Sequence, residues 1–251
     1  MEQLEKKIVN EESTFAKQLE PKLKPLYSRL IEDVKDLTGP KDASAVQWGK
    51  FFPPEANEGI LFVGRATNKW HTTEENIGVL FGNPTDSNTI FNCDDQMTWV
   101  YDCWNVGDYQ TRRSAFWRVI RKVASHYYES DELNHVAWSN ICKIQNHNGK
   151  NPEGRMFDCQ IKTCQEIFKI ELEVLSPHFV IMFIGNYGKR EMLSYLNGGE
   201  MPQEVKTTTW SSYHAAVYKI GGIVYICTEH PMRKDEDTHV DCLRNLINKY
   251  K

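Results

Sequence analysis

A histidine and a proline follow the last strongly apolar run of the chain. The run Ile223-Val224-Tyr225-Ile226 has the composition of a buried strand, and it leads into Thr228-Glu229-His230-Pro231 and then into charged residues. Because a proline keeps the residue before it extended, the pair can simply be the turn that stops the strand. Alternatively, His230 is the titratable group of an active site at the mouth of that strand. The second interpretation requires partner residues elsewhere in the chain.

Two further apolar runs end in residues that could be such partners. Residues 60–63, ILFV, stop at Gly64-Arg65, and residues 135–141, HVAWSNI, contain Asn140 near their end. The Asn140 amide offers both a donor and an acceptor, and the Arg65 guanidinium can hold a phosphate. Each has an ordinary alternative: Asn140 can cap the turn after its strand, and Arg65 can be solvated or paired with a glutamate at 74 or 75.

Strands that alternate with helices would position these residues. Short apolar runs bounded by glycine or proline predict buried strands, and apolar residues at helical spacing predict helices between them. The expected strands are 60–64, 135–141, 179–185, 215–219 and 223–227, with 179–185 at the centre, and the expected helices are 112–125, 158–175, 187–196 and 237–249. Such alternation predicts a mainly parallel sheet covered on both faces, with ligands at the carboxyl ends of its strands. In a parallel sheet, Gly64, Asn140 and His230 would face one cleft.

The first part of the chain has a different pattern. Residues 1–37 keep a helical period and predict two helices, and Gly39-Pro40 ends them. We expect residues 1–47 to form a helical arm that packs on an α/β domain of residues 48–251. The stretch after residue 64 is rich in Asn, Asp, Thr and Gly and predicts a long loop, and long loops in compact domains tend to be functional.

Composition narrows the class of protein. The 251 residues are 40% hydrophobic and 25% charged, which is typical of a globular chain of one large or two small domains. The formal net charge of −4 argues against broad attraction to nucleic acid, although it leaves room for a local basic face. No apolar run approaches the ~20 residues that span a bilayer. The charged start MEQLEKKIVNEEST lacks the apolar core of a secretion signal, so we expect a cytoplasmic protein with no membrane partner.

The seven cysteines are scattered and odd in number, and none forms a C-x-x-C pair. We therefore expect free thiols, no metal and no cofactor. His239 and Cys242 could share one helix face, but such a lone pair is more typical of packing than of a zinc site. The motifs of phosphate-loop enzymes, dinucleotide-binding enzymes, serine hydrolases and zinc proteases do not occur in the sequence.

Four motifs, taken in order, resemble the uracil-DNA glycosylase superfamily. ILFVGRATN, WSNICK, LSPHFVIMFIGN and ICTEHPM follow one another along the chain. The family has, in this order, a strand with a glycine loop, a strand ending in Asn, a Pro before a strand ending in Gly, and a strand ending in His-Pro-Ser. The resemblance covers roughly residues 58–248 and leaves out the N-terminal arm. The middle is closest to the bacterial iron–sulfur branch, through Asn140, Lys143, Cys164, Glu171-Leu172, Leu175 and Pro177.

The resemblance implies a three-layer α/β/α sandwich with a central, mainly parallel sheet. It also implies an enzyme that takes uracil or another modified base out of the DNA stack and hydrolyses its glycosidic bond. On this interpretation His230 stabilises the charge on the departing base, and Asn140 reads the edge of the base. Gly64, Arg65 and Ala66 would line the base pocket.

The same resemblance implies a DNA-binding surface. Met232 would be the apolar wedge that fills the vacated stack. Arg233 and Lys234, the cations next to it, would hold phosphates. The basic face of the helix 112–125, which includes Arg112 and Arg113, could add phosphate contacts, or it could be an ordinary solvated face. Trp70, Phe81 and Trp104 could stack on a base, or they could be ordinary loop packing.

Three departures from the family pattern favour an alternative. Gly64-Arg65-Ala66-Thr67 has no carboxylate or amide one or two residues after the glycine, where the family carries a catalytic residue. His-Pro-Ser is replaced by His230-Pro231-Met232, and the cluster-binding cysteines are missing. The alternative is a catalytically inactive module of the same fold that binds a base, a nucleotide or a protein. A basic rim around the cleft would favour DNA, and a neutral or acidic rim would favour the alternative.

Overall fold

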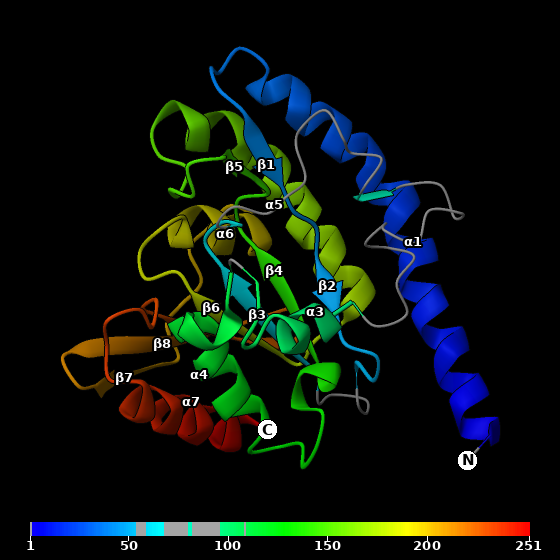
Figure 1. Cartoon of the computed structure of the whole chain (residues 1–251). Coiled ribbons are helices and arrows are strands. Elements are labelled where there is room, and N and C mark those ends of the chain that lie inside the picture. The colour runs from blue at the N-terminus through cyan, green and yellow to red at the C-terminus, as the bar shows by residue number, and fades with distance from the viewer. Residues whose placement is uncertain (1, 54–58, 68–79, 82–95, 108) are drawn as a thin grey trace. The chain divides into compact units, whose positions relative to one another are not determined.

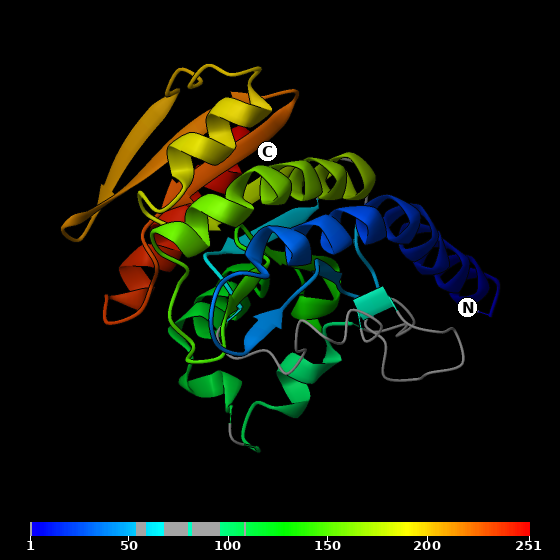
Figure 2. The same cartoon turned by 90° about the horizontal axis from the view of Figure 1, so that it is seen from above.

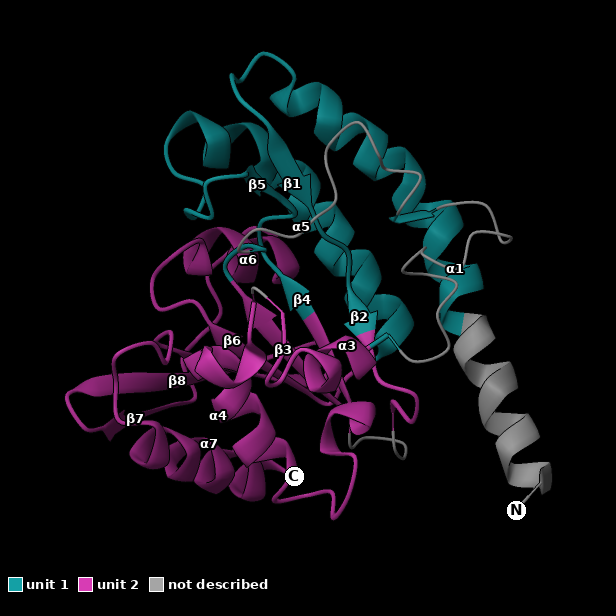
Figure 3. Ribbon diagram, viewed as in Figure 1, with its two compact units in different colours: residues 1–47, 65–96, 139–176 teal, residues 48–64, 97–138, 177–251 magenta. Residues whose placement is uncertain are grey.

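The computed structural model describes residues 2–53, 59–67, 80–81, 96–107 and 109–251, with side chains from residue 15 onward. These residues form a mixed α/β fold (Figure 1). Its main sheet has seven strands in the order β2 (Gln47–Trp48), β4 (Val136–Asn140), β3 (Ile60–Gly64), β6 (Phe179–Phe183), β9 (Ile223–Thr228), β8 (Tyr213–Ile220) and β7 (Lys206–Trp210). The chain divides into two compact units, residues 1–47, 65–96 and 139–176, and residues 48–64, 97–138 and 177–251 (Figure 3).

In the second unit β6 is the central strand, as the sequence predicted. It pairs in parallel with β3, where Val63 lies opposite Met182, and with β9, where Met182 lies opposite Cys227. Every residue of β3 and β6 is buried, which explains why both strands are continuous apolar runs in the sequence. The predicted parallel sheet is therefore confirmed for these three strands.

The sheet continues past β9 with antiparallel strands. Ala216 of β8 lies opposite Cys227, and Thr208 of β7 lies opposite Ala215. The sequence predicted one strand here, at 215–219, and missed β7. The reason is its composition, because Lys-Thr-Thr-Thr-Trp has mostly exposed side chains and no apolar run.

Four helices of the second unit lie in its described residues, α3 (Thr98–Asp102), α4 (Ala115–Ala124), α6 (Lys189–Leu196) and α7 (Glu236–Tyr250). The helix predicted at 112–125 begins later, because Thr111–Arg113 form a separate 3-10 turn. The Asp235 side chain caps α7 by accepting hydrogen bonds from the backbone N–H groups of Asp237 and Thr238. α7 packs on β7 and β9, and α4 packs on α7.

The first unit is built on two long helices, α1 (Glu2–Val34) and α5 (Arg155–Leu175), which lie side by side (Figure 2). It also holds a small antiparallel sheet of β1 (Lys41–Ala43) and β5 (Ile144–Asn146). The prediction of two helices within residues 1–37 is wrong. One helix runs through two exposed prolines, and its fully buried stripe is Leu19, Leu23, Tyr27, Leu30 and Val34.

Packing explains why the prolines do not end α1. Each of Pro21 and Pro25 removes one backbone hydrogen bond, but burial of the apolar stripe in the first unit outweighs this cost. No helix within the part of the chain that the structure describes combines the length and the apolarity needed to cross a membrane.

Candidate functional site

In the second unit, the carboxyl ends of three parallel strands share one edge of the sheet. β3 ends at Gly64, β6 leads to Gly185, and β9 leads through Thr228 to His230. The Gly185 N–H donates to the Thr228 carbonyl at 2.8 Å. Gly185 has a φ of +59°, which favours glycine, and a Cβ there would lie 2.7 Å from the Glu229 carboxylate, so that the Glu229 side chain would have to shift. Gly64 and His230 thus follow strands that end at the same edge, as predicted.

The ring of His230 is held in a defined orientation. Its Nδ1 accepts a hydrogen bond from the backbone N–H of Met232 at 3.2 Å. The ring lies nearly parallel to that of Phe116 in α4, with centroids 5.9 Å apart and planes 15° apart. Because Nδ1 is an acceptor, the neutral imidazole carries its proton on Nε2. His230 is therefore a hydrogen-bond donor through Nε2.

A tight turn follows His230. The Lys234 N–H donates to the Pro231 carbonyl at 3.1 Å, which places Met232 and Arg233 at the corners of the turn. Arg233 adopts a φ of +60°, a conformation that is strained for a residue with a side chain. The Met232 side chain is 59% exposed. The turn thus presents an apolar side chain and a cation to solvent, next to a half-buried histidine.

A second histidine, His239 of α7, is fully buried and lies next to Thr228 at the end of β9. His239 stacks on Trp210 at 3.8 Å between ring centroids, and its Nε2 lies 3.1 Å from the Thr228 hydroxyl. Burial, with smaller contributions from Lys234 and His230, lowers the pKa of His239 to about 3. His239 is thus neutral and packed in the core. In the described ranges, no group of three His, Cys, Asp or Glu side chains could together hold a metal ion.

All three basic side chains of α4 are paired with carboxylates of the second unit. Arg118 pairs with Glu236, with Nε 3.1 Å from both carboxylate oxygens, and Arg121 Nε lies 2.6 Å from Glu132 Oε1. Lys122 Nζ lies 2.7 Å from Asp237 Oδ1. The two predicted phosphate-binding residues before the helix, Arg112 and Arg113, are exposed in the 3-10 turn.

The predicted stacking aromatics have other contacts. The Arg121 guanidinium lies 4.2 Å from the centre of the Trp104 ring, and Phe81 packs edge-on against Tyr27 at 5.1 Å between centroids. Both side chains therefore fit the packing alternative. Trp70 lies outside the described residues, as do the glutamates at 74 and 75 that were possible partners of Arg65.

In the first unit, Asn140 is the last residue of β4 and only 3% exposed. No hydrogen bond joins its side-chain amide to any residue that the structure describes. The Cys142 N–H donates to the Arg65 carbonyl at 3.0 Å, which holds Arg65 and the half-buried Ala66 against the residues that follow Asn140.

Sequence reasoning missed one polar group in this segment. Thr67 is 6% exposed, and its hydroxyl is buried without a hydrogen-bond partner among the described residues. The sequence feature that could have indicated Thr67 is its place in the Gly64–Thr67 segment, where it is the one side chain with a hydroxyl.

A buried ion pair anchors the loop after Asn140. Lys143 Nζ lies 2.8 Å from Glu171 Oε1 of α5, and the Ser139 hydroxyl donates to Glu171 Oε2 at 2.7 Å. Both charged side chains are 0% exposed. Burial raises the pKa of Glu171, and the nearby Lys143 opposes this effect. Lys143 and Glu171, which contributed to the family resemblance, thus have a structural role in positioning this loop.

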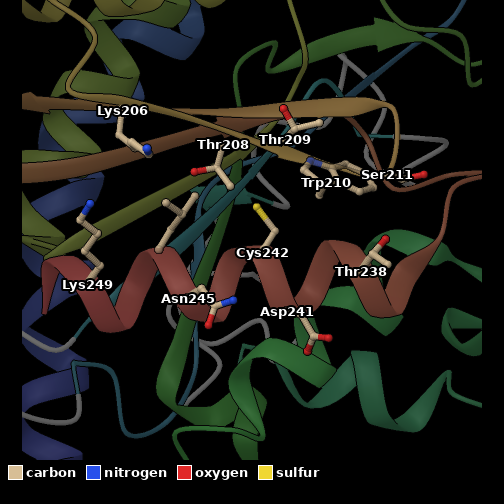
Figure 4. A pocket seen from close by; sticks show the side chains of 11 residues that line it. Lys206, Thr208, Thr209, Trp210, Ser211, Thr238, Asp241, Cys242, Asn245 and Lys249 are labelled. Carbon is tan, nitrogen blue, oxygen red and sulfur yellow. The ribbon is translucent and has the colours of Figure 1, made fainter.

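A groove of about 450 Å³ lies between β7 and α7 (Figure 4). One of its walls is Trp210, whose indole N–H donates to the Thr228 hydroxyl at 3.1 Å. Lys206 and Lys249 lie at the same end of the groove. None of the side chains predicted to contact a base or DNA lines it.

The chain matches no protein-family model, and no curated protein matches it at a significant level.

Proposed function

We propose that this chain binds an altered pyrimidine base extruded from DNA and hydrolyses the bond that joins the base to its sugar. The observation that carries the proposal is the defined tautomer of His230, at the end of β9. Its Nδ1 accepts from the Met232 N–H, so its Nε2–H is a donor. A donor of this kind stabilises an oxygen on which negative charge develops.

The reaction balances without a cofactor. The bond between C1′ of the sugar and the base nitrogen breaks, and its electron pair leaves with the base. His230 Nε2–H donates to the base oxygen that takes up the negative charge. The oxygen of a water molecule bonds to C1′, and the water proton passes to the departed base. The products are a free base and an abasic sugar.

Asn140 is assigned to recognition. A nearly buried amide without a protein partner among the described residues can offer a donor and an acceptor to the edge of a pyrimidine. Gly64, Arg65 and Ala66 form the adjoining chain, which we assign to the base pocket.

The turn after His230 is assigned to DNA. The exposed Met232 is the wedge that replaces the extruded base, and Arg233 and Lys234 contact phosphates on either side. Arg112 and Arg113 add phosphate contacts. We further infer that the sheet and its helices form the three-layer α/β/α sandwich of the uracil-DNA glycosylase type, which the parallel order β3-β6-β9 supports.

One observation favours a second function. Gly64-Arg65-Ala66-Thr67 contains no carboxylate or amide that could activate water. The second candidate is therefore a catalytically inactive module that binds the same base. General-base help is worth only ~10²–10⁴-fold, so its loss does not by itself abolish a dissociative cleavage.

A base-release assay separates the two functions. The full-length protein is incubated with single- and double-stranded oligonucleotides that each contain one altered pyrimidine, and abasic sites are detected by alkaline strand cleavage. The proposal expects abasic sites from at least one substrate. Binding without cleavage would support the inactive module, and absence of both binding and cleavage would contradict the two candidates together.

A further inference from the structure

The Thr67 hydroxyl is a buried polar group without a partner in the described part of the chain. The residue is 6% exposed, and Oγ1 makes no hydrogen bond there. Buried hydroxyls in folded proteins are nearly always paired, because an unpaired one loses its water without compensation. A valine, which has nearly the same shape, would avoid this cost. Other buried atoms of this unit, such as Asp42 Oδ2 and Gln96 Oε1, share this state, and Thr67 differs from them by its place in the Gly64–Thr67 segment.

A second unpaired polar group lies in the same unit. The Asn140 amide is 3% exposed and has no side-chain hydrogen bond to the described residues. The hydrogen bond from the Cys142 N–H to the Arg65 carbonyl, at 3.0 Å, ties the segment of Thr67 to the segment of Asn140. Both side chains are thus without a hydrogen bond in the described part of the chain, and they belong to backbone segments that are bonded together.

We propose that Thr67 is a specificity-determining residue that hydrogen-bonds the same base as Asn140. This inference rests on the proposed recognition of a pyrimidine by Asn140, and it does not require that the base is cleaved. An amide side chain provides one donor and one acceptor in a plane, and a hydroxyl provides a donor that rotates to meet a second oxygen. The ligand class is a planar heterocycle that carries adjacent carbonyl and N–H groups along one edge.

The test compares binding and stability in four variants, one of which, Asn140→Ala, removes the amide that is assigned to recognition. The probe is an oligonucleotide that contains one 2′-fluoro-deoxyuridine, whose glycosidic bond resists hydrolysis, and its comparison is the same oligonucleotide with thymidine. Thr67→Val removes the hydroxyl and keeps the shape, and Thr67→Ser keeps the hydroxyl. Thr163→Val is the matched control in the same unit, because the buried Thr163 hydroxyl already donates to Asp33 at 2.6 Å.

We expect Thr67→Val to change the melting temperature and the affinity in opposite directions, so that the protein becomes more stable but binds the probe less tightly. Thr67→Val should raise the melting temperature by roughly 2–4 °C, because an unpaired buried hydroxyl is removed. The same variant should weaken binding of the uracil probe by roughly two- to tenfold and reduce its preference over thymidine. Thr67→Ser should retain the affinity of the wild type. Thr163→Val should lower the melting temperature and leave the affinity unchanged.

Different outcomes would overturn the inference and the proposed function. If wild type binds the probe and Asn140→Ala weakens binding, but Thr67→Val binds as tightly as wild type, Thr67 has no role and recognition by Asn140 stands. A fall in melting temperature for Thr67→Val would also overturn the inference, because it would show that the hydroxyl stabilises the fold. If wild type does not bind the probe at all, the proposed function fails, and the inference fails with it.

Discussion

His230 and Asn140 differ in the kind of hydrogen bond that each can make. The His230 ring is a donor through Nε2, since the Met232 N–H occupies Nδ1. The Asn140 amide is both donor and acceptor, and it is nearly buried. A donor aimed at a leaving group acts mainly in the transition state, whereas a donor and acceptor pair distinguishes one base from another in the bound state. Substitutions at the two positions should therefore have different consequences.

Replacement of Asn140 should alter selectivity. We expect Asn140→Ala to weaken binding of the preferred base by about 1–3 kcal/mol, the value of one or two hydrogen bonds, and to reduce discrimination among bases by a similar amount. The measurement is the rate of base release, or the affinity, for several altered pyrimidines in one sequence context. If Asn140→Ala prefers the same bases in the same order, with the same differences in rate or affinity between them, Asn140 only caps its turn.

His239 should make the stability of the protein depend on pH. Burial lowers its pKa from 6.5 to about 3, so the unfolded chain binds a proton near pH 6.5 and the folded chain does not. The contribution of neutral His239 to the free energy of unfolding is fully present above pH 6.5, and it is lost as the pH falls toward 3. Between pH 7 and pH 5 we expect the free energy of unfolding to decrease by about 2 kcal/mol on this account.

The pH prediction is tested by urea unfolding at both pH values. The control variant is His239→Phe, which keeps an aromatic ring against Trp210 and cannot titrate. Its free energy of unfolding should decrease less between pH 7 and pH 5 than that of the wild type. The same decrease in both proteins would mean that His239 has the same pKa in the folded and the unfolded chain, and would contradict the prediction.

At the scale of elements, the connection from β4 to α5 depends on a buried ion pair. Removal of Lys143 leaves the Glu171 charge without its partner in a site that is 0% exposed. We expect Lys143→Met to lower the free energy of unfolding by about 3–5 kcal/mol. Replacement of both residues, Lys143→Met with Glu171→Met, should recover much of this loss. Urea unfolding of the single and double variants measures both effects, and equal stability of the two would contradict the account.

The elements that were predictable are those whose burial appears directly in the sequence. β3, β6 and β9 are continuous apolar runs, and the inner face of α4 repeats Phe116, Trp117, Ile120 and Val123 at helical spacing, so both were recognised. β7 has no such run, and the two prolines of α1 suggested an interruption that the packing of the helix prevents. Local pattern therefore predicts elements that bury their own apolar face. It does not predict those that depend on distant partners.

The candidate site was predictable only in part, for a related reason. His230 and Asn140 follow apolar runs, so their positions at strand ends could be inferred. The contact of Met232 N–H with Nδ1, which defines the His230 tautomer, depends on a turn with a strained Arg233. The pairing of Arg118 with Glu236 joins residues from distant parts of the chain. Neither contact follows from local sequence pattern. The unpaired hydroxyl of Thr67 is visible only when its surroundings are known.

At the scale of the whole molecule, the formal net charge is −4, so any DNA contact must be local. The exposed cations Arg112 and Arg113 remain available, whereas Arg118 is paired with Glu236. If the first two contact phosphates, Arg112→Ala with Arg113→Ala should weaken DNA binding. It should also reduce the slope of log affinity against log salt by about 2.

The control for this prediction is Lys122→Ala. It removes a positive charge from the same region, but it should leave the salt slope unchanged and cost less than about 1 kcal/mol of stability, because Lys122 is already paired with Asp237 and the pair is exposed. The measurement is the DNA affinity of wild type and the variants at several salt concentrations between low and moderate. Equal slopes for wild type and the double variant would exclude Arg112 and Arg113 from the DNA contact.

The most direct test of the central claim is a single-turnover comparison of wild type with His230→Ala, on the substrate that releases its base fastest. Thermal melting first establishes that the variant is folded. Loss of the Nε2 donor should lower the rate of base release by about 10²–10³-fold, while the dissociation constant for the uncleaved DNA stays within about twofold of wild type. Equal rates for the two proteins would contradict the account and leave His230-Pro231 as a turn that ends β9.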